Sequence, residues 1–163
     1  MSVMSATTPE QRLAAAGYAL PTPPKPRGAY APFHVQVMSS GSRRLTVSGQ
    51  TCRIGGVAVA GCCATSDSLE PARAAAKVAM LNVLAAVASA CGGMLPTCLD
   101  VCRVRGFIRS TAEFTAHTAV LDAASDILRT AWPDAISPAR TAVGVASLPD
   151  GAFIEIEMEA VLQ

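Results

Sequence analysis

The last segment of the chain, residues 152–162, constrains the fold most strongly because its side chains alternate strictly. Ile154, Ile156 and Met158 point one way, and Phe153, Glu155, Glu157 and Glu159 point the other. A period of two is that of a β-strand with one buried face. The chain therefore builds a sheet, and another layer must cover the apolar face of that sheet.

Two segments with helical spacing supply such a layer. The first is expected from a cap at Ser68 to about Ala90, before the glycine pair at 92–93. Its apolar positions include Ala74, Val78, Leu81 and Ala85. The second is expected to follow the capping-box pattern at residues 110–113 and to end at residues 132–133. One stripe of it comprises Phe114, Thr118, Leu121, Ser125 and Leu128.

The remaining apolar segments predict the other strands. Residues 33–38 and 45–50 form a predicted hairpin, and residues 57–59 a short strand. A long strand is expected over residues 99–108, with Val101, Arg103, Arg105 and Phe107 on one face, and another over residues 140–148. The order ββ(β)αβαββ predicts an α+β fold, a mixed sheet with two helices packed on one face.

The N-terminal part of the chain is predicted to be an addition to the main domain. Residues 1–27 comprise a short predicted helix, 9–19, and a proline-rich connector; residues 28–163 form the predicted domain. Met1 to Thr8 lacks the apolar core of a secretory signal. We expect residues 1–16 to contribute less to folding than the body.

The composition of the chain limits the classes of binding partner that are expected. Hydrophobic residues make up 51% of the chain and charged residues only 15%, below the usual quarter. The sheet face opposite the helices, predicted to carry Val and Ile, needs a cover, which favours self-association. A net charge of +1 gives no field for nucleic acid. No apolar run approaches the roughly 18 residues that span a bilayer.

The cysteines predict free thiols in a reducing compartment. The six cysteines form no Cys-x-x-Cys pair, and His34 and His117 lie far from them in sequence. We therefore expect no metal site and no cofactor. A cytoplasmic location is favoured over a mitochondrial one.

Arg140 is the main candidate for a functional side chain, because it begins a strand in a mostly apolar segment. A guanidinium there must find an anion, and it can fork onto a ligand carboxylate. The alternative partner is Glu155 or Glu157 on the next strand. Glu155 either belongs to a solvated edge or holds a water in a cleft. Tyr30 either lines a pocket or packs against other side chains.

Several of these residues form a pattern that resembles the RidA/YjgF family, also called L-PSP endoribonuclease. The pattern comprises Gly28-Ala29-Tyr30, Val47-Ser48-Gly49-Gln50, Pro138-Ala139-Arg140, Val143 to Pro149 and Ile154-Glu155-Ile156-Glu157. The resemblance covers roughly residues 17–162, and it is nearest to a longer branch with an N-terminal helix. It implies a chorismate-mutase-like fold and a homotrimer with clefts between subunits.

The resemblance also implies an activity, the hydrolysis of 2-imino or enamino acids to 2-oxo acids and ammonia. Arg140 would clamp the substrate carboxylate, helped by the backbone N–H of Ala142. Glu155 would place the attacking water, while Tyr30 and Ser48 line the cleft.

Two departures from the family keep other functions open. Ala142 stands where well-studied members have Cys, and Asp122 is the nearest match to a common Asn. An acid there would repel a carboxylate ligand, which favours a non-catalytic trimeric module that binds a small carboxylate metabolite. A ribonuclease is less favoured, because there is no basic groove or stacking platform.

Overall fold

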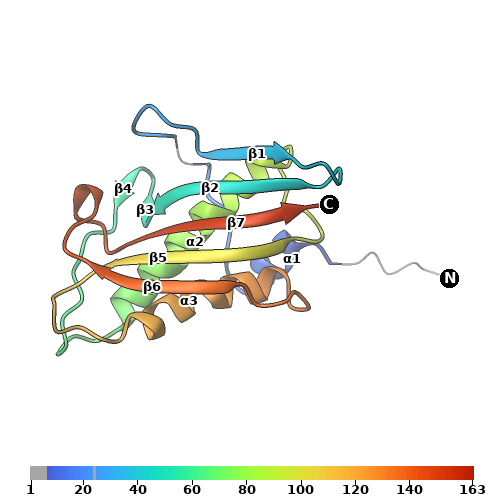
Figure 1. Ribbon diagram of the computed structural model, residues 1–163. Helices are drawn as coiled ribbons and strands as arrows, with labels where there is room; N and C mark the ends of the chain where they lie inside the picture. The colour runs from blue at the N-terminus through green and yellow to red at the C-terminus, as the bar shows by residue number, and fades with distance from the viewer. Residues whose placement is uncertain (1–6, 24) are drawn as a thin grey trace.

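The computed structural model describes residues 7–23 and 25–163, so most of the segment from Met1 to Thr8 lies outside it. Figure 1 shows the elements along the chain. They are α1 (Pro9–Ala15), β1 (Phe33–Val37), β2 (Arg43–Thr51), β3 (Arg53–Ile54), β4 (Val57–Ala58), α2 (Glu70–Ala90), β5 (Asp100–Arg109), α3 (His117–Ala131), β6 (Ala139–Val145), the 3-10 turn η1 (Pro149–Gly151) and β7 (Ile154–Leu162).

The main sheet has the strand order β1-β2-β7-β5-β6, and α2 and α3 lie on one face of it (Figure 1). Every neighbouring pair in it is antiparallel except β5 and β6, which α3 connects as a parallel crossover. The predicted α+β fold with a mixed sheet is confirmed. The last two strands are not neighbours, because β5 lies between β6 and β7.

Small residues on α2 let it pack closely on the sheet. Its buried positions are mostly alanine, and they face the buried side of β7, where Ile154, Ile156 and Ala160 are fully buried. By length and composition α2 is apolar enough to cross a membrane, contrary to the sequence-based expectation, but 67% of its apolar window is buried inside the protein. We interpret α2 as the core helix of this fold.

The start of α3 differs from the sequence prediction. The helix begins at His117, and no side chain caps it. Residues 110 and 111 instead pair with Cys63 just after the end of β5, since Cys63 forms a bridge to Ser110 and accepts a hydrogen bond from the Thr111 N–H. Strand pairing therefore outcompetes the capping-box pattern.

A register shift in β5 explains a second difference. The pairing of β5 with β7 slips between Val101 and Arg103. Val101 is consequently buried on the helix-covered face together with Val104, rather than sharing a face with Arg105 as the alternation predicted. A bulge of this kind reverses the side-chain pattern on one side of it.

The open face of the sheet is more polar than expected. Ile154 and Ile156 of β7 lie under the helices, as expected for the apolar face of this strand. Arg105 occupies the centre of the open face, where it pairs with Glu157 at 2.5 Å and Glu159 at 2.7 Å. The predicted Val and Ile surface is present in part, because Val143 of β6 is 40% exposed on this face, beside the charged ladder.

The helix α1 packs onto the body rather than extending away from it. Leu13 is 1% exposed and belongs to the main core, and Arg12 Nε donates to the Ala131 carbonyl at the end of α3. A capping box formed by Thr8 and Gln11 starts the helix. This packing gives the N-terminal segment a direct role in stability.

We therefore predict that Leu13→Ala lowers the free energy of unfolding by about 2–3 kcal/mol, because a buried leucine is truncated and a cavity remains. Urea denaturation followed by circular dichroism measures the change. Met94→Ala, at a side chain 72% exposed, is the control and should alter stability by less than about 0.5 kcal/mol. Equal effects of the two substitutions would show that α1 contributes nothing to the fold.

Candidate functional site

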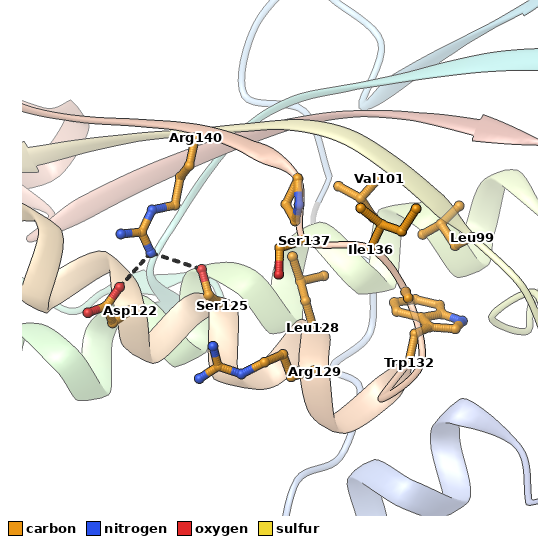
Figure 2. A pocket seen from close by; sticks show the side chains of 12 residues that line it. Leu99, Val101, Asp122, Ser125, Leu128, Arg129, Trp132, Ile136, Ser137 and Arg140 are labelled. Atoms are coloured by element: carbon orange, nitrogen blue, oxygen red, sulfur yellow. Dashed lines mark hydrogen bonds and ion pairs between the residues drawn. The ribbon is translucent and has the colours of Figure 1, made fainter.

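Arg140 lies near the start of the edge strand β6 and points toward α3 (Figure 2). It is in register with the buried Val104, so its side chain is on the helix-covered face of the sheet. Its Nη1 donates to Asp122 Oδ1 at 2.7 Å and to Ser125 Oγ at 3.0 Å. Its anionic partner is therefore on α3, and neither glutamate of β7 considered in the sequence is that partner.

A cavity of about 200 Å³ begins at this ion pair and runs between α3 and the first residues of β5 and β6. Asp122, Ser125 and Arg140 form its polar end (Figure 2). Its apolar wall includes Leu99, Val101, Leu128, Trp132 and Ile136. The cavity thus combines a charged head region with an apolar trough.

Glu155 lies on the opposite face of the sheet. Its register partner on β5 is Phe107, on the face that carries Arg105. The side chain extends over Gly49, where a Cβ atom would come within 2.0 Å of Glu155 Oε1. Only a glycine at position 49, where the pairing of β2 is irregular, leaves room for the Glu155 carboxylate at its observed location.

The environment of Glu155 increases the affinity of this carboxylate for a proton. Burial raises the pKa of this carboxyl above its usual range, the nearby Glu157 carboxylate raises it further, and Arg53 lowers it in part. Arg53 is also bound to Asp150 at 2.6 Å. A carboxyl of raised pKa is suited to exchanging a proton near neutral pH.

A buried asparagine fixes the end of β2 beside this carboxylate. Asn82 of α2 is 2% exposed, and its Nδ2 donates to the carbonyls of Thr51 and Arg53 at 3.0 Å each. Thr51 is in turn the register partner of Glu155. The helix layer thereby positions a group on the far side of the sheet.

The other predicted site residues divide between these two places. Ala142 is on the helix-covered face two residues from Arg140. Ser48 adjoins Gly49, and its hydroxyl donates to the Ala31 carbonyl at 2.6 Å, which ties down the loop carrying Tyr30. Tyr30 itself is 51% exposed. One chain thus presents two separate half-sites, which we call the arginine half-site (Arg140, Ala142) and the glutamate half-site (Tyr30, Ser48, Glu155).

Sequence reasoning missed the pairing of Arg140 with Asp122 and the apolar trough beside it. Asp122 was considered only as a possible source of repulsion, and Ser125 only as part of a helix stripe. Their spacing of three residues, on the helix that precedes the arginine strand, was the available signal.

The remaining candidate groups in the described residues are potential metal ligands and thiols. Within residues 7–23 and 25–163, no three His, Cys, Asp or Glu side chains are grouped as a metal site would require. All six cysteines are free thiols. Burial, with help from Cys62 and Asp67, raises the pKa of Cys63 to about 11, so this thiol stays protonated and unreactive at neutral pH.

The family model described as Endoribonuclease L-PSP matches residues 23–162. The chain belongs to this family, which includes the YjgF-like proteins. The predicted family membership is confirmed.

Relatives of known sequence or structure agree with this assignment. Protein TCP17 of Trypanosoma cruzi is 31% identical over 160 residues, 96% of each chain. The crystal structure of a protein of unknown function from Agrobacterium tumefaciens is 32% identical, with a TM-score of 0.83 over 95% of this chain and 92% of that one. The YjgF gene product of E. coli is 26% identical, with a TM-score of 0.59 over 87% and 94%.

We predict that Gly49→Ala displaces the Glu155 carboxylate and lowers its pKa toward the ordinary value. The new Cβ would collide with the end of a flexible side chain, so the carboxylate moves toward water while the fold persists. A carboxyl ¹³C NMR titration measures the pKa, and Glu155→Gln identifies the resonance. An unchanged pKa in a folded variant would show that the glycine does not hold the carboxylate in its buried position.

Proposed function

We propose that the protein hydrolyses 2-imino or enamino acids to 2-oxo acids and ammonia, in a cleft formed between two copies of the chain. The observation that carries this proposal is the division of the site. Arg140 and Glu155 lie on opposite faces of one sheet, so a single chain cannot direct both at one small substrate. Apposition of one copy's arginine half-site and another copy's glutamate half-site brings the two groups together.

The residues on each side match the steps of such a hydrolysis. Arg140 uses only Nη1 in its two hydrogen bonds to described residues, so Nε and Nη2 can fork onto a substrate carboxylate. Glu155 of the second copy places a water against the C2 atom of the substrate. Because an iminium carbon is already electrophilic, orientation and one proton acceptor suffice.

The reaction balances without a cofactor. The water oxygen bonds to C2 while the C=N π electrons move to nitrogen, and Glu155 accepts a proton from the water. Glu155 then returns that proton to the amine, and the C–N bond breaks to release ammonia. Glu155 accepts the hydroxyl proton as the C=O bond forms and passes it to the ammonia. The products are a 2-oxo acid and ammonium.

A second candidate function is a trimeric module that binds a small carboxylate without turnover. The ion pair between Asp122 and Arg140 favours it, because a carboxylate already occupies part of the guanidinium. A ribonuclease has no comparable support, since the whole chain carries a net charge of +1.

An ammonia-release assay separates these functions. An amino-acid oxidase generates imino acids in place, and ammonia release is compared with buffer alone. We predict that Arg140→Lys lowers kcat/KM by about 30-fold or more, because an ammonium cannot reproduce the planar fork. Glu155→Gln should retain binding of 2-oxo acids but lose turnover. Arg140-dependent binding without ammonia release above buffer would establish the binding module and exclude the enzyme.

Mixing two inactive variants tests whether the site is shared. When Arg140→Ala and Glu155→Gln chains are unfolded and refolded together in equal amounts, about a quarter of the sites in a cyclic oligomer receive both native groups. We predict recovery of about a quarter of the wild-type turnover, in a particle that light scattering identifies as a trimer. Variants refolded separately and then mixed are the control. No recovery in mixed oligomers would contradict a site shared between Arg140 of one copy and Glu155 of another.

A further inference from the structure

The ion pair between Arg140 and Asp122 is more open to solvent on the Asp122 side than an ion pair that only neutralises a buried arginine needs to be. The Asp122 side chain is 51% exposed, whereas that of Arg140 is 22% exposed. Among the described residues, the only hydrogen bond from Arg140 to this carboxylate uses Oδ1. Asp122 Oδ2 accepts no hydrogen bond within the described residues, and the Asp122 side chain lines the cavity beside Arg140 (Figure 2).

The pair thus offers a negative and a positive group side by side. The Asp122 Oδ1 and Arg140 Nη1 atoms are 2.7 Å apart. An α-amino acid or a 2-iminium acid carries the complementary pair, a carboxylate and a cationic nitrogen separated by one carbon atom. Such a ligand can lie antiparallel to the protein's ion pair, with its carboxylate on Arg140 and its nitrogen on Asp122, so that all charges are satisfied.

We infer that Asp122 is a specificity-determining residue, which makes this site select acids with a cationic nitrogen on C2 over 2-oxo acids. The inference rests on the proposed function, because it takes Arg140 as the carboxylate anchor. A 2-oxo acid offers only ketone lone pairs to the Asp122 carboxylate, and that contact is repulsive. The substrate iminium is consequently retained, and the product is released once its nitrogen has left.

The neighbouring trough extends the selectivity to the side chain of the ligand. From the ion pair, the cavity runs along Leu128 toward Trp132 and Ile136 (Figure 2). An apolar side chain on C2 buries its surface there, whereas a cationic one meets the Arg129 guanidinium, which also lines the cavity. This site therefore favours acids with aliphatic side chains over acids with cationic side chains.

Leucine and its matched 2-oxo acid, 4-methyl-2-oxopentanoate, are the probes for a calorimetric test. Wild-type protein should bind leucine more tightly than the oxo acid. In Asp122→Asn the Kd for leucine should rise about tenfold or more, because a charge-assisted contact is lost. The Kd for the oxo acid should fall, because the repulsion is removed and the guanidinium is freed.

A control acid lies just before α3. Glu113 is exposed and does not line the cavity, so Glu113→Gln should leave the ratio of the two Kd values unchanged. If Asp122 merely holds Arg140 in place, Asp122→Asn shifts both Kd values in the same direction. That result, or wild-type protein that fails to prefer leucine, overturns the inference.

Arg140→Ala separates this inference from the function on which it rests. Loss of both ligands in this variant supports the carboxylate anchor, whatever Asp122→Asn shows. Retention of both ligands in Arg140→Ala contradicts the proposed function itself. Loss of both with an unchanged Kd ratio in Asp122→Asn contradicts only the role of Asp122.

Discussion

The alternation of β7 under an alanine-rich helix determines where every candidate functional group lies. Ile154, Ile156 and Met158 fit against α2, which approaches closely because its buried surface is mostly alanine. The strand cannot shift by one residue without placing glutamates in the core. Glu155 is thereby fixed on the open face, and the parallel pairing of β6 with β5 fixes Arg140 on the covered face.

The open face carries charges with unequal environments. Arg105 pairs with Glu157 and Glu159, so both of these carboxylates have a cation beside them. Glu155, at the end of the same ladder, has a raised pKa because it is buried and lies near Glu157. The surroundings of Glu155 thus distinguish its carboxyl from those of Glu157 and Glu159. The sequence alone does not show this difference, because the three glutamates are equivalent in its alternating pattern. A subunit interface over this ladder of charges would be polar there, and the strength of that part would depend on salt.

Local patterns predicted the elements, whereas pairing between distant segments decided the details. Both long helices and the strand β7 were recognisable, since their periodicity reflects one buried face. The predicted start of α3 was wrong because Cys63, nearly fifty residues upstream, pairs with Ser110 just after β5 ends. The face of Val101 was wrong because a register shift with β7 is a property of two strands together. Both errors arise from hydrogen bonds that no local window of sequence contains.

The same limit applied to the candidate site. The sequence indicated Arg140 and Glu155 as important side chains, but it placed them one tight turn apart, as if they were on neighbouring strands. The insertion of β5 between β6 and β7 separates them, and α3 brings Asp122 to the arginine instead. An acid that looked like an obstacle to a carboxylate ligand thus becomes half of a charge pair. A ligand with only a negative charge is repelled by Asp122, whereas a zwitterion pairs with both Asp122 and Arg140. A single substitution from the Asn common in the family to Asp can therefore change which form of a metabolite the site retains.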